Sequence, residues 1–64
     1  MRTIRGEVEY RSKFTYWDGS HYTGEWLVGT DKRQGRGVHV FANGHKYDGQ
    51  WKNDKRHGYG TYTW

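Results

Sequence analysis

Histidines are the first side chains here that are suited to chemistry, because imidazole groups act as metal ligands and as general acids and bases. The four histidines are His21, His39, His45 and His57. Their spacings match no short metal-ligand motif. The chain has no cysteine and hence no thiolate ligand or nucleophile, and the two serines, Ser12 and Ser20, stand in or beside turn-like sequence. We therefore expect neither a metal site nor a nucleophilic active centre.

Paired carboxylates and paired glycines are two further patterns with a chemical interpretation. Glu7 and Glu9 fall on one side of an extended segment, where they are interpreted as solvated side chains. The glycine pairs are Gly35-Arg36-Gly37 and Gly58-Tyr59-Gly60. A phosphate-binding loop needs a strand followed by a helix, and no segment here has helical periodicity. The glycines are interpreted as structural, and no enzyme activity and no cofactor is expected.

Basic residues form the remaining chemical signal. The chain has eleven Lys and Arg against seven Asp and Glu, a formal net charge of +4. Two clusters stand in similar sequence contexts: Lys32, Arg33 and Arg36, and Lys52, Lys55 and Arg56. Such clusters attract anionic lipid headgroups, with about 1 kcal/mol from each Lys or Arg near a charged surface, and solvated turn charge is the other interpretation. Nucleic acid is not expected, because the rings that would stack on bases are needed for the core.

An internal repeat explains why the basic clusters correspond. Residues 22–26, Tyr-Thr-Gly-Glu-Trp, recur at 47–51 as Tyr-Asp-Gly-Gln-Trp, and residues 32–37, Lys-Arg-Gln-Gly-Arg-Gly, recur at 55–60 as Lys-Arg-His-Gly-Tyr-Gly. We expect one domain over 1–64, made of an irregular partial repeat (1–21), a repeat (22–46) and a repeat that stops before its last turn (47–64). Stacked repeats would bring the basic loops to one edge.

This pattern resembles the MORN repeat family. The features that carry the resemblance are Tyr-x-Gly-x-Trp, the Lys-Arg-His-Gly-x-Gly segment, and an Asp-Gly or Asn-Gly turn, and residues 47–64 match almost position for position. The chain departs from the family pattern by an insertion at Thr30-Asp31, by Gln34 where His is usual, by Asp54 where Gly is usual, and by its irregular first 13 residues. These departures affect one hairpin and the N-terminal edge.

Period-two alternation places the aromatic residues and the glycines on one face of the predicted strands. The aromatic members of this face are Tyr22, Trp26, Phe41, Tyr47, Trp51, Tyr62 and Trp64. Its glycines are Gly24, Gly35, Gly37, Gly49, Gly58 and Gly60. Only six residues are Leu, Ile or Val, so the core must come from rings. A ring can cover the bare backbone of a glycine on the next strand, and we predict Tyr22 over Gly37 and Tyr47 over Gly60.

Turn sequences set the register of the predicted hairpins. Residues 53–54, Asn-Asp, suit a two-residue turn, which would pair Gly49 with Gly58 and Tyr47 with Gly60. Residues 42–44, Ala-Asn-Gly, allow a two-residue turn that sets Tyr47 beside Val40.

The same Ala-Asn-Gly segment also allows a three-residue loop with Gly44 in the left-handed region. That loop would set Tyr47 beside His39 and Gly49 beside Gly37. We prefer it, because it alone keeps all the rings on one face. His39 then occupies the place of a core aromatic residue, equivalent to Tyr62.

These features together predict an all-β protein. Its fold would be a meander of antiparallel β-hairpin repeats with about five or six short strands, forming a mostly single-layered twisted sheet without a helix. Trp64 lies inside the last predicted strand, so an unpaired edge is expected there. Further repeats of a longer array would cover that edge, or another copy would pair with it, and we favour the array.

The resemblance implies a function in interaction, since MORN-like arrays are protein-interaction and assembly modules at cytoskeletal, ciliary and membrane-junction sites. We expect a non-catalytic cytoplasmic scaffold, associated with the cytoskeleton or a membrane. It would bind a protein partner through the aromatic–glycine face or the free strand edge, and that edge would also allow self-association. The alternative is an adaptor for anionic phospholipid surfaces that acts through the basic hairpin loops.

Overall fold

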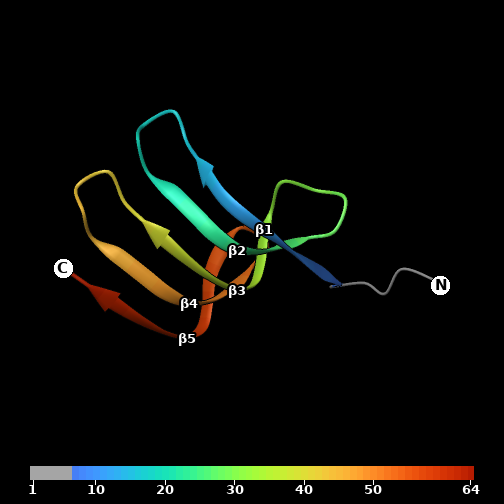
Figure 1. The fold of residues 1–64 in the computed structure, drawn as a ribbon. Coiled ribbons are helices and arrows are strands. Elements are labelled where there is room, and N and C mark those ends of the chain that lie inside the picture. Colours follow the sequence, from blue (N-terminus) through green and yellow to red (C-terminus); the bar gives the residue numbers. More distant parts are fainter. Residues whose placement is uncertain (1–6) are drawn as a thin grey trace.

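The structure is a computed structural model, and it describes residues 7–64. Its strands are β1 (Val8–Thr15), β2 (His21–Leu27), β3 (Arg33–Val40), β4 (Lys46–Lys52) and β5 (Lys55–Thr63). They form one antiparallel sheet in the order β1-β2-β3-β4-β5 (Figure 1), so each strand pairs with its neighbour in the sequence. Residues 7–64 contain no helix. The predicted all-β hairpin meander is confirmed, while residues 1–6 of the predicted partial repeat lie outside the described residues.

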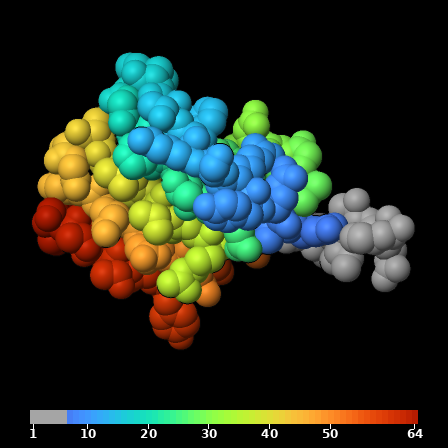
Figure 2. Space-filling view, in the orientation of Figure 1, coloured from blue at the N-terminus to red at the C-terminus, as the bar shows by residue number. Residues whose placement is uncertain are grey.

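The sheet is twisted and curved, and its loops gather at two ends. The loops around residues 16–20 and 42–45 extend side by side from one end (Figure 1). At the other end the β4–β5 turn lies against the start of β3, where the Asp54 amide donates to the Arg33 carbonyl at 2.9 Å. In the space-filling view, residues of β1 and the last residues of the chain lie on different sides of the molecule (Figure 2). The equivalent turns of the repeat, at residues 16–20 and 42–45, thus lie next to each other at one end of the sheet.

A row of buried rings forms the core on one face of the sheet. Tyr22, Trp26, Tyr47 and Trp51 are at most 7% exposed. Their rings meet edge to face, with centroids 5.1 Å apart for Tyr22 and Trp26, 5.4 Å for Tyr22 and Trp51, and 5.3 Å for Tyr47 and Trp51. Edge-to-face contact places the positive rim of one ring against the negative face of the next. Aromatic packing thus replaces the aliphatic core that the composition lacks.

The predicted three-residue loop at residues 42–44 is confirmed. Tyr47 pairs with His39, and Gly49 pairs with Gly37. The loop is closed by the Phe41 amide, which donates to the His45 carbonyl at 2.8 Å. Gly44 has a φ of +92°, a conformation that costs glycine nothing and other residues about 1 kcal/mol.

The turn at residues 53–54 has the predicted two-residue length, but the predicted pairing beyond it is wrong. Lys52 pairs with Lys55, and both turn residues have positive φ, as a turn of type I′ requires. Further along the strands, Gly49 pairs with Gly60 in place of Gly58, and Tyr47 pairs with Tyr62 in place of Gly60. A bulge in β5 adds two residues on that strand, which shifts the register without moving any residue to the other face.

The bulge recurs between β2 and β3, and the first glycine of each Gly-x-Gly motif explains it. Gly35 and Gly58 have positive φ, +90° and +62°. The next amide points to a side chain of the preceding strand: the Arg36 amide donates to Glu25 Oε1 at 2.7 Å, and the Tyr59 amide donates to Gln50 Oε1 at 3.1 Å. The bulge therefore keeps its donors satisfied.

The second glycine of each motif makes room for a ring, as predicted. A Cβ atom at Gly37 would overlap the Tyr22 ring, and one at Gly60 would overlap the Tyr47 ring. The Tyr22 hydroxyl donates to the Glu25 carbonyl at 2.8 Å. The Tyr47 hydroxyl likewise donates to the Gln50 carbonyl at 3.2 Å, so each tyrosine is held across its glycine by a hydrogen bond to its own strand.

Candidate interaction surface

The seven residues of the predicted aromatic face differ in exposure along the sheet. Tyr22, Trp26, Tyr47 and Trp51 are buried in the core. Phe41 and Tyr62 pack partly buried against that core, while Trp64 is 85% exposed. The first four rings are framework, because a partner would have to unfold the sheet to reach them. Among these seven residues, the accessible aromatic surface therefore lies at the β5 end, while at the β1 end Phe14, which is outside the predicted set, is 49% exposed and contacts Trp26 at 5.7 Å between ring centroids.

Arg33 is built into this framework. Its side chain is only 16% exposed, and its guanidinium lies 4.4 Å from the centroid of the Trp51 ring. Nη2 donates to the Asp54 carbonyl at 2.9 Å, and Nε donates to the Asp54 carboxylate. Its charge is therefore compensated inside the protein, although the sequence had made it an anion-binding candidate.

His39 is a neutral member of the same cluster. Burial lowers its pKa below the usual 6.5, and the charge of Arg33 lowers the pKa further, an effect that His21 reinforces and that Asp18 and Asp54 oppose. Arg33 Nη1 donates to His39 Nδ1 at 3.1 Å, so this nitrogen must be the unprotonated acceptor. The imidazole thus serves as a ring in the core, as the sequence predicts.

Tyr22 is likewise held in its neutral form. Burial raises the pKa of its hydroxyl to about 12, and the Arg33 charge partly opposes this. The hydroxyl remains a hydrogen-bond donor over the whole physiological range.

The remaining basic candidates do not form one patch. Arg36 points from the opposite face of β3, with Nε 3.7 Å from Asp48 Oδ1 and a side chain 73% exposed. Lys32 is exposed in the β2–β3 loop. The structure pairs Lys52 with Lys55, both exposed beside the β4–β5 turn, whereas Arg56 pairs with Trp51 and lies over the Tyr47 and Tyr62 rings, on the other face of the hairpin.

Comparison with known proteins agrees with this geometry. The family model described as MORN repeat matches residues 31–46 and 47–64, which is more than half of the chain. The chain belongs to the MORN repeat family. A MORN repeat-containing protein 3 of Xenopus laevis is 44% identical over 47 residues, which cover 72% of this chain and 19% of the relative. The chain thus spans about a fifth of that relative's length, and no solved structure matches it.

The two MORN repeats place an equivalent arginine in unequal surroundings. Arg56 occupies in β5 the position that Arg33 occupies in β3. Its guanidinium lies 5.6 Å from the Tyr47 ring centroid and 5.8 Å from that of Tyr62. A hollow of about 410 Å³ lies beside it, lined by Arg33, Phe41, Trp51, Lys55 and Arg56.

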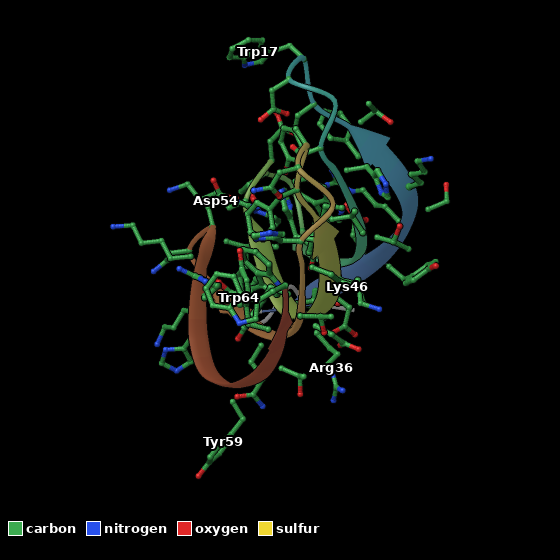
Figure 3. The ribbon with its side chains drawn as sticks, turned by 90° about the vertical axis from the view of Figure 1, so that its left-hand side faces the viewer. Trp17, Arg36, Lys46, Asp54, Tyr59 and Trp64 are labelled. Carbon is green, nitrogen blue, oxygen red and sulfur yellow. The ribbon has the colours of Figure 1, made fainter. Side chains whose placement is uncertain are left out.

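Several exposed aromatic residues were not among the predicted site residues. Trp17 is 98% exposed at the β1–β2 loop, and Tyr59 is 85% exposed. Figure 3 shows both side chains pointing away from the sheet, with Tyr59 at the outside of the bend in β5. Alternation would have located Tyr59, since it stands between two glycines of the core face. No periodic pattern marks Trp17, which lies in a turn.

Two kinds of site find no support in the described part of the chain. No group of three or more His, Asp or Glu side chains within residues 7–64 is arranged to hold a metal ion. Over the same residues, no helix is long and apolar enough to cross a membrane.

Proposed function

We propose that this MORN module is a non-catalytic scaffold that binds a protein partner along the free edge of β5. The proposal rests on the backbone hydrogen-bond pairing of that edge. The nine-residue β5 pairs only with β4 among the described residues. A strand edge with unpaired backbone groups is a template for an added strand, whose main chain supplies affinity while its side chains supply specificity.

The aromatic residues at this edge support a protein partner. Tyr62 is partly buried and Trp64 is 85% exposed, and their ring centroids are 4.7 Å apart. Large rings that bury little in the isolated module are typical anchors of protein interfaces. The other residues of the aromatic face position these two rings and are not expected to touch the partner.

Photo-cross-linking tests this proposal. A benzophenone amino acid replaces Trp64 in one variant and Lys13 of β1 in a control, and each variant is irradiated in cell extract. We expect discrete protein adducts from position 64 that excess unlabelled module suppresses, and no matching adducts from position 13. Identical adducts from both positions, or adducts that resist competition, would refute binding along β5. The scaffold proposal also places the protein in the cytoplasm at the cytoskeleton or a membrane, which imaging of the tagged protein tests.

A second candidate function is the anionic phospholipid adaptor, favoured by the pair Lys52 and Lys55. These residues face each other beside the turn and are exposed, and neither makes an ion pair with another described residue. Co-sedimentation with vesicles of phosphatidylcholine, alone or mixed with phosphatidylserine, tests it across a salt series. Salt-sensitive binding to the mixed vesicles alone, lost on K52E/K55E and kept on K13E, would support the adaptor. No binding at low salt would exclude it.

A further inference from the structure

The loop between β3 and β4 has the same backbone contacts as the loop between β1 and β2. In each, the residue before the loop, at position 16 or 41, donates its amide at 2.8 Å to the carbonyl four residues later. The carbonyl of that residue accepts the amide of the loop glycine, at 3.0 Å in the first loop and 2.9 Å in the second. These glycines, Gly19 and Gly44, both have a φ of +92°. The two loops therefore share one backbone arrangement.

The loops differ in the residue before the glycine, which is Asp18 in the first and Asn43 in the second. Asp18 Oδ1 accepts the Ser20 amide at 2.9 Å, and Asn43 Oδ1 accepts the His45 amide at 3.0 Å. A carboxylate and a carboxamide thus make the same backbone contact at equivalent positions. The structure already contains the aspartate form of the Asn43 loop.

An exposed Asn-Gly pair is open to an intramolecular reaction. The backbone nitrogen of the glycine, once it has lost its proton to solvent, can attack the side-chain amide carbon of the asparagine and close a succinimide ring. Glycine hinders this attack least, because it has no Cβ beside the nitrogen. Asn43 and Gly44 are both exposed, and the space beside Gly44 is open, since an added Cβ would meet no atom within 4 Å.

The hydrogen bonds of the loop show how the reaction would start. The His45 amide, which donates to Asn43 Oδ1 at 3.0 Å, polarises the side-chain carbonyl and stabilises the negative oxygen that forms during attack. The Gly44 amide donates to the Phe41 carbonyl at 2.9 Å, so this bond must open before the nitrogen can react. Both partners of that bond belong to the loop and its first flanking residue, and an exposed loop opens at a low free energy.

We propose that Asn43 is a site of spontaneous modification, which converts it to aspartate or isoaspartate. The Gly44 nitrogen forms a bond to Cγ of Asn43, the bond from Cγ to the side-chain nitrogen breaks, and that nitrogen takes up a proton from solvent and leaves as ammonia. Water then opens the ring. Cleavage between the Gly44 nitrogen and Cγ yields aspartate, and cleavage between that nitrogen and the backbone carbonyl carbon yields isoaspartate. The chain takes up one water and releases one ammonia, with no change of oxidation state.

The two products have different consequences for the sheet. Aspartate retains the normal backbone and adds a carboxylate to the loop that lies beside the Asp18 loop (Figure 1), which lowers the formal net charge from +4 by one. Isoaspartate adds a methylene group to the backbone of the three-residue loop that sets Tyr47 beside His39. Because this register keeps the rings on one face, isoaspartate should destabilise the β3–β4 hairpin.

The second asparagine of the chain, Asn53, is an internal control. The nitrogen that would attack it belongs to Asp54, whose side chain hinders the reaction and whose amide donates to the Arg33 carbonyl at 2.9 Å. The Asp54 carboxylate and carbonyl also bind the Arg33 guanidinium. The turn at residues 53–54 is therefore attached to β3, and its opening requires the loss of charged contacts.

Asp18 is protected by its charge. The hydroxyl and the amide of Ser20 donate to its carboxylate and lower its pKa. An ionised carboxylate is a poor target for a nitrogen nucleophile, so Asp18 should remain unmodified while Asn43 reacts. Equivalent loops of the two repeats therefore differ in chemical stability.

Timed incubation of the full chain tests the proposal. Samples kept at mildly alkaline pH are digested, and residues 43 and 53 are followed by mass spectrometry, with isoaspartate detected by a methyltransferase specific for it. We expect Asn43 to convert at least about tenfold faster than Asn53, since the turn at Asn53 opens only with the loss of charged hydrogen bonds. Mildly acidic pH should slow the reaction, because fewer Gly44 nitrogens lose their proton. N43Q should prevent it, because glutamine would have to form a larger ring.

The N43D variant tests the fit of the aspartate product. Its circular dichroism spectrum and Tm should match those of the parent chain, whereas the isoaspartate fraction, separated by chromatography, should have a lower Tm. The inference is overturned if Asn43 stays intact while a free peptide of residues 41–46 converts, or if Asn43 and Asn53 convert equally fast. A large decrease of Tm in N43D would also overturn it, because the Asp18 loop would then be no guide to the modified loop.

Discussion

Replacing Arg33 by methionine is expected to lower the free energy of unfolding substantially, because this arginine connects β3 to β4 and to the β4–β5 turn. It lies on the Trp51 ring, donates to His39, and binds the turn that contains Asp54. Methionine keeps an unbranched side chain of similar length that can still pack on the rings. The substitution therefore removes the charge and the hydrogen bonds and retains most of the apolar contact.

The magnitude follows from the contacts that are lost. The cation–π contact with Trp51 accounts for about 1 kcal/mol. The charged hydrogen bonds to Asp54 account for about 1 kcal/mol after allowance for solvent, because that carboxylate is 46% exposed. Leaving the buried acceptor of His39 without a donor costs about 1 kcal/mol more. A total of roughly 2–3 kcal/mol lowers the Tm of a domain this small by roughly 10–20 °C.

Thermal unfolding followed by circular dichroism measures this effect, and R56M is the matched control. Arg56 has the same place in the next repeat but is exposed, and its ring contacts are longer, at 5.6 and 5.8 Å. We expect R56M to lower stability by less than about 1 kcal/mol. Equal decreases of Tm in R33M and R56M would refute the assignment of Arg33 to the framework. A decrease of less than about 0.5 kcal/mol in the free energy of unfolding of R33M would also refute it.

Three further substitutions test other parts of the fold. G37A should lower the free energy of unfolding, measured by urea denaturation, by about 2–3 kcal/mol, because the added methyl group would occupy the place of the Tyr22 ring. Because the pKa of His39 is lowered in the folded state, the unfolded chain binds a proton at this imidazole more readily. The free energy of unfolding should therefore fall as the pH falls below 6.5. H39Y should make the Tm less dependent on pH. E25A should cost about 1 kcal/mol by leaving the Arg36 amide without its acceptor, whereas E25Q keeps an acceptor and should be nearly neutral.

Each of these has a control within the chain. If the added methyl group clashes with the Tyr22 ring, G37A should lower the free energy of unfolding by less in a chain that already carries Y22L. Strictly additive losses in the double variant would contradict this explanation. If the Tm of H39Y depends on pH as steeply as that of the parent chain, the pH dependence must come from another histidine. Similar losses in E25A and E25Q would show that the bulge does not depend on a side-chain acceptor.

The loop at residues 42–44 shows how far the sequence alone could define the register. Of the two turns that its sequence allows, only one keeps the rings on a single face, and the structure has that turn. The prediction succeeded because a one-residue slip would have moved every aromatic side chain to the wrong side of the sheet. Hydrophobic pattern and turn chemistry were sufficient for this hairpin.

The β4–β5 hairpin shows where the same reasoning fails. The bulge there adds two residues to one strand, so Gly49 pairs with Gly60 and each ring remains on its face. Side-chain alternation along a strand repeats every two residues, so it looks the same before and after a register shift of two residues. The usable signal was the chemistry of Gly58, which takes positive φ, together with the acceptor side chain of Gln50.

The sequence by itself determined the class of fold, the family, and the face on which the rings and glycines gather, because alternation, turns and ring–glycine spacing act over a few residues. It did not distinguish Arg33 from Arg56, since both follow a lysine and precede the same Gly-x-Gly pattern. The tertiary structure distinguished them, because β4 and its turn cover Arg33. Burial and charge compensation depend on what the adjacent strand supplies, and equivalent residues of a repeat therefore differ in role.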